Sequence, residues 1–443
     1  MDETQLYEFM NDQLPIKKLE KDKYGEVFTS PVLIHKMLDL FPNNIWTNYK
    51  LTWLDPSVGA GFFMICVYMR LMNGLKQWES NDEKRSKHII ENMLYMVELN
   101  KNNCHICKHI FGTKLNLICG DFLSDIKFDK LTFDCIVGNP PFQDDYGLNN
   151  KGKRINGGKN KLYERIFLKA FNILKPKGYL SFIVPDNIFA GNGSLSYQTL
   201  IQNYISFVSF NPSNQSFFHK IQQPVCYFIL YKDNVNKLTE IEHDDKLTFQ
   251  IKLQDRPVNP IRNWTPHTEK LINQFVSSER NNVIYNRGKS ITSYKGNKYH
   301  LVYTPSKTLK TNNPKLAPGI GIKKAIVFSI SPDLAFKMDY TGKFGAGPNT
   351  FIIPFNTISE GKKLETFLNS DDYKTLALAT KTTRQYLKIS FIEHLKYTYT
   401  FKKGVAKNNK KDVAKYTFKK GVAENNKFTR KYTKKGKIKQ MIS

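Results

Sequence analysis

Short apolar runs alternate with amphipathic stretches along the first half of the chain. The runs are rich in β-branched and aromatic residues and end at glycine, asparagine or acidic residues, which predicts strands. They lie at residues 51–54, 93–99, 115–123, 133–139, 178–189 and 224–232. Helical periodicity occurs between them, at residues 61–72, in a segment ending near residue 111, and at residues 163–174. This alternation predicts an α/β fold with a doubly wound, mostly parallel sheet over residues 1–232.

A different pattern follows in residues 233–401. Short apolar runs at residues 246–253, 299–304, 324–330 and 349–355 are separated by glycine and proline turns. We expect a second, mixed α/β domain with more direct strand pairing. Residues 402–443 are too polar to form a core, and we expect a third, weakly ordered part of the chain there.

Charge identifies the class of partner. The chain has 67 Lys and Arg against 39 Asp and Glu, a formal net charge of +28, which favours nucleic acid. Fifteen basic and two acidic residues lie in residues 402–443, and the segment YTFKKGVAKNNK at 399–410 recurs as YTFKKGVAENNK at 416–427. This basic tail either contacts phosphates or is an inert low-complexity extension.

Apolar and cysteine content indicate the compartment. No run of 18 apolar residues is present and the N-terminus lacks a signal-peptide core, so we expect a cytoplasmic protein without membrane contact. Cys66, Cys119 and Cys135 lie in apolar runs and are interpreted as reduced core residues. Cys104 and Cys107 form a C-x-x-C pair with no second pair at zinc spacing, so we expect no metal site.

Polar residues end four successive predicted strands. Asp55, Glu98, Asp121 and Asn139 each lie at or just past a strand end. In parallel α/β sheets, ligands bind at the carboxyl ends of the strands. Any one of these side chains could instead be a helix cap or a turn residue, but four in register favour a binding site.

The turn after the first strand indicates what the site binds. Gly59 and Gly61 allow the backbone to approach a ligand, and the turn has no lysine for a phosphate. Glu98 is placed to bind ribose hydroxyls, and Asp121 to accept a hydrogen bond from an adenine amino group. A cationic cofactor such as S-adenosylmethionine therefore fits this set of carboxylates better than a phosphate-bearing one.

The fourth strand ends in the segment FDCIVGNPPFQ at residues 133–143. The two prolines, Pro140 and Pro141, cannot continue a sheet, so the carbonyls of Asn139 and Pro140 are left for other partners. With the Asn139 side chain and the ring of Phe142, they suit a planar group that carries an exocyclic amino group. The alternative is a strand-ending turn with Phe142 packed in the core.

Together these segments resemble the adenine-N6 DNA methyltransferases of the gamma arrangement, which are found in restriction-modification systems. The matching segments are GEVFTSP at 25–31, DPSVGAG at 55–61, NPPF at 139–142 and LKPKGYLSFIVP at 174–185. The resemblance covers about residues 24 to 232 and implies a Rossmann-like methyltransferase sheet. Two departures are a gap of 43 residues from Asp55 to Glu98, which includes an apparent helical insertion at 73–89, and Ser30 in place of a common proline.

The resemblance also assigns roles to residues. The cofactor S-adenosylmethionine would be bound by Thr29, Asp55, Gly59, Gly61, Glu98, Asp121 and Asn139. The catalytic loop would be Asn139, Pro140, Pro141 and Phe142, acting on a flipped-out adenine. Phe217 or Phe218, with Phe218 favoured, would form a second aromatic wall or simply belong to the core. Residues 233–401 would be the target recognition domain.

A basic segment follows the catalytic loop at residues 149–161. It contains Lys151, Lys153 and Arg154 and no acidic residue, so it is either a phosphate-contacting loop or a solvated flexible one.

Three functions remain open from the sequence. The first is a monomeric, site-specific DNA adenine methyltransferase, the modification component of a bacterial or viral restriction-modification system. It would act on double-stranded DNA, and a separate cognate endonuclease is left open as a partner. The second is methylation of RNA or of a protein glutamine. The third is a nucleic-acid-binding module with an inactive methyltransferase fold.

Overall fold

The computed structural model describes a large part of the 443-residue chain. The described residues are 29–124, 130–142, 161–190, 194–210, 224–243, 247–253, 256–261, 263–286, 294–331, 333–381, 387 and 389–396. The chain divides into two compact units, Met1–Glu269 and Lys270–Ser443.

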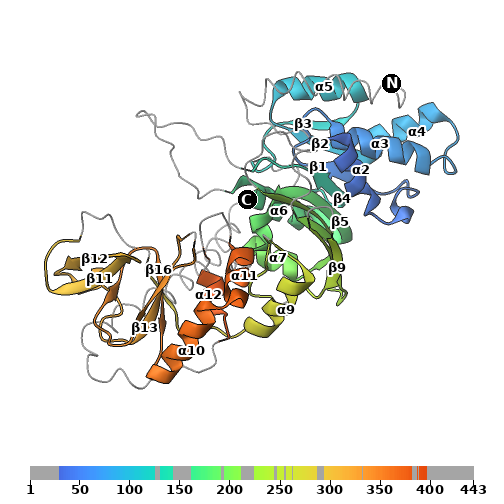
Figure 1. Ribbon diagram of the computed structural model, residues 1–443. Coiled ribbons are helices and arrows are strands. Elements are labelled where there is room, and N and C mark those ends of the chain that lie inside the picture. The colour runs from blue at the N-terminus through green and yellow to red at the C-terminus, as the bar shows by residue number, and fades with distance from the viewer. Residues whose placement is uncertain are drawn as a thin grey trace, which may run out of the picture. The chain divides into compact units, whose positions relative to one another are not determined.

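A nine-stranded sheet forms the centre of the first unit, in the order β3-β2-β1-β4-β5-β7-β6-β8-β9 (Figure 1). Its strands are β1 (Trp53–Asp55), β2 (Leu94–Glu98), β3 (Asn116–Cys119), β4 (Phe133–Gly138), β5 (Leu174–Pro185), β6 (Tyr204–Phe210), β7 (Val225–Tyr231), β8 (Thr239–His243) and β9 (Leu247–Ile251). The first five in this order are mutually parallel, and β7 is antiparallel to both β5 and β6. The predicted large, mostly parallel sheet is therefore confirmed.

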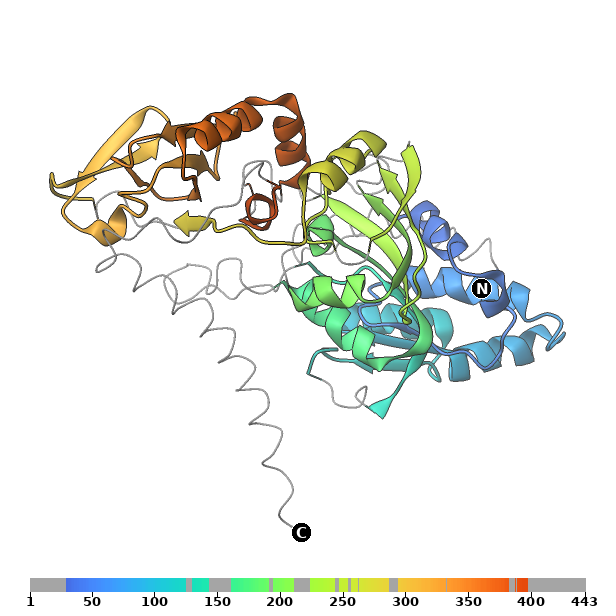
Figure 2. The ribbon, with the colours of Figure 1, turned by 90° about the horizontal axis from the view of Figure 1, so that it is seen from below.

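Helices cover both faces of this sheet, as the two views show (Figures 1 and 2). The helices of this unit are α2 (Pro31–Asp39), α3 (Phe62–Gly74), α4 (Asp82–His88), α5 (Lys101–Phe111), α6 (Leu162–Ile173) and α7 (Leu195–Ile201), while α9 (Pro266–Phe275) spans the boundary between the two units. Successive side chains of a strand point to opposite faces. Trp53 accordingly packs in a core with α2, α3 and α5, and its neighbour Leu54 in a second core with α6 and α7. Burial on both faces explains why β1 has no exposed position.

The long gap between Asp55 and Glu98 is occupied by helices. After α3 the chain forms α4 and then a single π-helical turn, η2 (Ile89–Met93), which leads directly into β2. Asn81 caps α4 by accepting a hydrogen bond from the Lys84 N–H at 2.9 Å. The insertion predicted at residues 73–89 therefore contains a helix, α4, after a turn, and it leaves the pairing of β1 with β2 intact.

The first unit extends to Glu269, beyond the predicted boundary at residue 232. The apolar run at residues 246–253, expected in the second domain, contributes β9 to the large sheet. β8 pairs with β6 in parallel and with β9 antiparallel, so both strands extend the sheet of the first unit.

The second unit contains two smaller sheets. One has the order β10-β16-β13-β14 and is antiparallel throughout, and the other has the order β12-β11-β15. The elements are β10 (Ile284–Asn286), β11 (Tyr299–Thr304), β12 (Lys307–Thr311), β13 (Lys324–Phe328), β14 (Phe336–Asp339), β15 (Gly345–Ala346), β16 (Thr350–Pro354), α10 (Ile358–Asn369), α11 (Asp371–Thr380) and α12 (Ile389–Glu393). Within the described ranges, no helix is apolar and long enough to cross a bilayer.

Candidate active site

Three of the predicted site residues lie at one edge of the large sheet. β1 pairs in parallel with β2 on one side and with β4 on the other. Asp55 and Glu98 are the last residues of β1 and β2, and Asn139 directly follows β4. Because the carboxyl ends of parallel strands meet at the same edge, the topology brings these side chains together.

The glycine turn after β1 is fastened to the end of β2. Glu98 Oε2 accepts a hydrogen bond from the Gly59 N–H at 2.7 Å, and Glu98 Oε1 accepts one from the Asn100 N–H, also at 2.7 Å. Gly59 and Gly61 have φ values of +57° and +93°, a region that side chains disfavour. Glu98 thus positions the turn whether or not it also contacts a ribose.

Asp55 is a buried carboxyl group, with 1% of its surface exposed. Burial raises its pKa to about 8; the Ser57 N–H, which donates to Asp55 Oδ1 at 3.0 Å, opposes this rise, and the charge of Glu98 adds to it. A cation at this site would favour the ionised form of Asp55, so the site is suited to a positively charged ligand.

Gly138, the last residue of β4, contacts the Asp55 carboxyl group. A Cβ atom at this position would lie 2.7 Å from Asp55 Oδ1, closer than such atoms approach each other. Only glycine therefore allows the backbone that leads into the predicted catalytic loop to pass beside Asp55. Gly138 was not among the predicted site residues, although a glycine directly before Asn139 is a signal for close packing.

A hydrogen bond joins the segment before α2, which contains Thr29, to the loop after β4, which contains Asn139. Asn139 Nδ2 donates to Thr29 Oγ1 at 3.2 Å across 110 residues of sequence, and Thr29 is 5% exposed. Ser30 follows as the N-cap of α2, where its hydroxyl accepts the Leu33 N–H at 3.3 Å. This capping role explains a serine where related sequences often have proline.

The rest of the predicted catalytic loop lies partly at the surface. Pro140 is buried, Pro141 is exposed and Phe142 is half-buried. The Phe142 ring meets Tyr163 edge to face, with centroids 6.5 Å apart and planes at 78°. Phe142 packs against both cores of the first unit. Its ring therefore contributes to the core, as the alternative interpretation suggested, and is also partly accessible.

Two further residues lie just after β3 and β2. Asp121 is exposed, and its Oδ1 accepts the Leu123 N–H at 2.9 Å, which makes it a turn residue in this structure. Leu99, which directly follows Glu98, is 72% exposed. A leucine so exposed at the carboxyl edge of the sheet is an apolar surface, and it was not among the predicted site residues.

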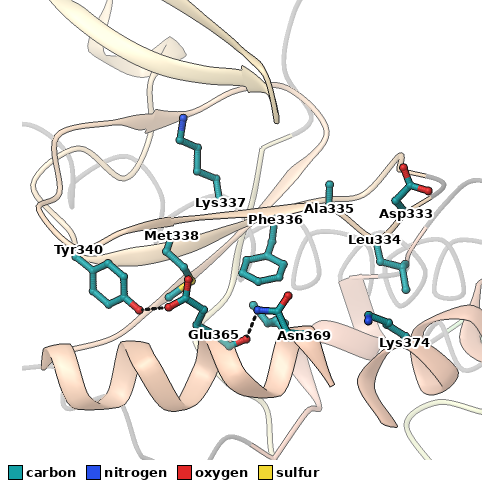
Figure 3. A pocket seen from close by; sticks show the side chains of 11 residues that line it. Asp333, Leu334, Ala335, Phe336, Lys337, Met338, Tyr340, Glu365, Asn369 and Lys374 are labelled. Carbon is teal, nitrogen blue, oxygen red and sulfur yellow. Dashed lines mark hydrogen bonds between the residues drawn. The ribbon is translucent and has the colours of Figure 1, made fainter. Parts of the chain in front are cut away.

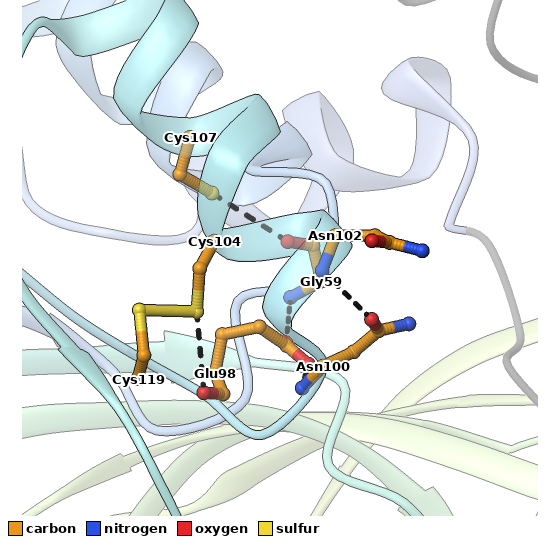
Figure 4. Close-up of a disulfide and its surroundings, with 7 residues drawn as sticks. All are labelled: Gly59, Glu98, Asn100, Asn102, Cys104, Cys107 and Cys119. Atoms are coloured by element: carbon orange, nitrogen blue, oxygen red, sulfur yellow. Dashed lines mark hydrogen bonds between the residues drawn. A yellow bond between two sulfur atoms is a disulfide. The ribbon is translucent and has the colours of Figure 1, made fainter.

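Cysteines surround the glycine turn (Figure 4). Cys104 of α5 forms a disulfide with Cys119 of β3, with Cα atoms 6.1 Å apart. Cys104 Sγ also lies 3.5 Å from the Glu98 carbonyl oxygen, and Cys107 Sγ 3.5 Å from the Gly59 carbonyl oxygen. The interpretation of Cys119 as a reduced core residue is wrong, because it is exposed and bonded to Cys104; Cys66 and Cys135 are buried free thiols.

Five predicted site residues lie outside the described residues. They are Lys151, Lys153, Arg154, Phe217 and Phe218. In the described ranges, no three His, Cys, Asp or Glu side chains cluster in a way that could hold a metal.

A separate cavity of about 630 Å³ lies in the second unit, between β14 and α10 (Figure 3). The Tyr340 hydroxyl donates to Glu365 Oε2 at 2.6 Å on its wall, and Asn369 Nδ2 donates to the Glu365 carbonyl at 3.0 Å. None of its lining residues belongs to the predicted site.

Part of the first unit is similar to known methylases. The Eco57I restriction-modification methylase family matches residues 44–217. An adenine-specific methylase of Mycoplasma pneumoniae, itself uncharacterized, is 26% identical over a region that is 38% of this chain and 57% of that protein. Both matches agree with the resemblance to adenine-N6 methyltransferases that the motifs predicted.

Solved structures show distant similarity. The DrdV–DNA complex has a TM-score of 0.47 at 14% identity, covering 80% of this chain and 51% of that one. The type IIL restriction-modification enzyme MmeI, in complex with DNA, has a TM-score of 0.45 at 12% identity, covering 88% and 66%. A type I restriction-modification methyltransferase subunit from Streptococcus thermophilus has a TM-score of 0.36 at 19% identity, covering 52% and 50%. The chain spans about half to two thirds of the length of these relatives.

Proposed function

We propose that the protein is a site-specific DNA methyltransferase that transfers a methyl group from S-adenosylmethionine to N6 of a flipped-out adenine. Its natural role would be the modification step of a restriction-modification system, with the second unit, from Lys270 to about residue 401, contributing target recognition. The family match at residues 44–217 and the net charge of +28 support this proposal.

The residues at the sheet edge fit S-adenosylmethionine. Asp55 and Glu98 provide two carboxyl groups, and the turn at 55–61 has no basic side chain that would repel a cation. When bound, this cofactor supplies an electrophilic methyl group on a sulfonium. Asp55 would interact with the positive charge of the cofactor. Glu98 would keep the glycine turn in place and contact the ribose, and Leu99 would cover an apolar face of the cofactor.

The catalytic loop fits a planar amino group. The Asn139 Oδ1 and Pro140 carbonyl oxygens would accept hydrogen bonds from N6 and concentrate its lone pair on nitrogen, which otherwise is delocalised into the ring. Phe142 would stack on the base and hold it out of the duplex. No covalent enzyme intermediate is needed, because aligning nitrogen with the methyl group is sufficient for transfer.

The hydrogen bond between Asn139 and Thr29 carries this proposal. It turns the Asn139 amide so that Nδ2 faces Thr29 and Oδ1 faces the other way. An amide held in this way is a preorganised acceptor, because its orientation is set before the substrate arrives. It also couples the loop that would act on the base to the segment before α2 that would contact the cofactor.

The test is methyl transfer from labelled S-adenosylmethionine to duplex DNA, RNA or protein, followed by identification of the methylated product. We expect N6-methyladenine in DNA. Asn139→Ala should nearly abolish transfer with little change in calorimetric cofactor affinity, and Thr29→Val should lower the rate less severely. Asn92→Ala, at an exposed asparagine, is the matched control and should behave as wild type. Methylated RNA or glutamine, or full activity of Asn139→Ala, would refute the proposal.

A further inference from the structure

One segment of the second unit has an unusual charge composition. Residues 280–332 contain ten Lys or Arg and no Asp or Glu. A segment of this length that contains many basic and no acidic residues is suited to binding a polyanion.

Four exposed lysines of this segment lie on the β11–β12 hairpin or in the turn before it (Figure 1). Lys307 and Lys310 are exposed on β12, which is the edge strand of its sheet in the part of the chain that the structure describes. Lys295 and Lys298 are exposed in the turn that leads into β11. We refer to these four residues as the lysine ribbon. None of the four forms an ion pair with a described residue.

Hydrogen bonds hold the ribbon in a fixed shape. Asn312, just after β12, accepts the N–H groups of Asn297 and Lys298 through Oδ1 at 3.1 and 3.2 Å, and its own N–H donates to the Lys295 carbonyl at 3.0 Å. Gly296 passes so close to Asn312 that a Cβ there would lie 2.4 Å from Asn312 Cγ. The turn carrying two lysines is therefore fastened to the end of the strand carrying the other two.

The hairpin tip is anchored as well. The Lys307 N–H donates to Thr304 Oγ1 at 3.1 Å, and the register shifts between Val302 and Thr304, which marks a bulge. On the opposite side, Leu301 and Val302 are buried and join β11 to β15. Lys307 and Lys310 thus lie on the open edge strand of a sheet whose central strand, β11, pairs with β15 on its other side.

We propose that the lysine ribbon is a phosphate-contacting surface for duplex DNA. This inference rests on the proposed function and names the element that holds the substrate. A two-stranded ribbon has the width that a major groove admits, and lysines are suited to phosphates as point charges rather than to reading bases. The ribbon therefore supplies affinity and register, not sequence preference.

The test compares two double variants of equal charge change. Lys307→Gln with Lys310→Gln removes two ribbon charges, and Lys362→Gln with Lys363→Gln removes two exposed charges from α10. DNA affinity is measured from 50 to 200 mM salt. If each ribbon lysine neutralises one phosphate, the slope of log K against log salt becomes shallower by about 1.8 in the ribbon variant alone. The deficit in affinity at 50 mM should then shrink about 12-fold by 200 mM.

The outcomes separate this inference from the proposed function. Cofactor affinity, the methylated product and sequence preference should be unchanged in the ribbon variant at saturating DNA. Equal effects of both variants would show a non-specific charge effect and overturn the inference, as would an unchanged slope or a ribbon that binds RNA in preference to DNA. Failure of the proposed function would instead appear in the wild type, as absence of DNA methylation.

Discussion

Asp55 and Glu98 place two carboxyl groups at one edge of the sheet. Without a bound cation, ionisation of both groups is unfavourable. Burial and the neighbouring carboxylate both raise the cost of ionising Asp55. Most buried carboxyl groups are compensated by a basic side chain, whereas Asp55 has a backbone N–H from Ser57. A bound cation would supply the missing compensation, which links ligand affinity to the protonation of one residue.

Cofactor affinity should therefore depend on pH. The folded-state pKa of Asp55 is raised to about 8, so at lower pH the carboxyl group is mostly protonated and a proton must leave when a cation binds. We expect affinity to increase between about pH 6 and pH 7.5, approaching tenfold per pH unit, and to peak near pH 8, where the amino group of the cofactor begins to lose its charge. Calorimetry in buffers of different ionisation enthalpy measures both the affinity and the proton release. Asp55→Asn should bind weakly with no such slope below pH 7.5, and a wild-type affinity that is flat over this range would contradict the assignment.

A second residue-level prediction concerns Gly138. A methyl group at this position would meet Asp55 Oδ1 at 2.7 Å and displace the carboxyl group. We expect Gly138→Ala to weaken cofactor binding at least tenfold while the protein remains folded by circular dichroism. Gly120→Ala is the matched control, because its added Cβ would have only Ile118 Cγ2 nearby, at an ordinary 3.7 Å. Equal affinities of the two variants would show that the contact with Asp55 has no role in binding.

Part of the site could be predicted from the sequence, but the packing of its residues could not. Asp55, Glu98 and Asn139 could be placed together because each ends a predicted strand, and parallel strands end at one edge. The roles of Gly138 and Leu99 depend on a distance and on an exposed fraction, and neither quantity follows from residue order. The pairing of Cys104 with Cys119 likewise required knowing which face of α5 meets the end of β3.

At the scale of elements, the positions of the strands were predicted more reliably than the sheet to which each strand belongs. Alternating burial has the same period in any sheet, so the run at residues 246–253 was recognised as a strand but assigned to the wrong neighbours. Its partner β8 pairs with β6 across a connection that no local pattern reveals. The sequence predicted the type of sheet that the order β3-β2-β1-β4-β5 represents, because parallel strands joined by helices favour a doubly wound sheet.

The link between α5 and β3 yields a prediction at this scale. The Cys104–Cys119 bond closes a loop of 15 residues beside Glu98, whose side chain fixes the glycine turn. Chain-entropy arguments give such a loop up to about 3 kcal/mol of stabilisation. Adding a reductant should therefore lower the melting temperature and weaken cofactor binding, because the support of Glu98 is loosened.

Cys119→Ser serves as the control for this effect. The variant should behave as the reduced wild type, and reductant should change neither its melting temperature nor its cofactor affinity. Mass spectrometry after alkylation of free thiols reports whether Cys104 and Cys119 are bonded in the starting material. A bonded wild type whose cofactor affinity is unaffected by reduction would show that the disulfide does not support the site.

At the scale of the whole molecule, positive charge is divided between the structured part and the tail. The tail at residues 402–443 has fifteen basic and two acidic residues, so it contributes +13 of the total +28 and leaves +15 for residues 1–401. The lysine ribbon belongs to the second share. Charge on a hydrogen-bonded ribbon fixes a register on DNA, whereas the tail repeats a short polar sequence with no candidate catalytic group.

Removal of the tail tests this division of roles. A protein that ends at Thr400 should fold, methylate the same site and keep its sequence preference, because the predicted site lies in the first unit and the tail lysines carry no base-reading geometry. Its DNA affinity at low salt should fall, and the slope of log K against log salt should become shallower by about 0.9 for each phosphate lost. The ribbon variant and the truncation should then act additively on this slope, since they remove different phosphate contacts. Equal slopes with and without the tail would identify it as an inert extension, and a changed recognition sequence would assign it a role in reading bases that its composition does not predict.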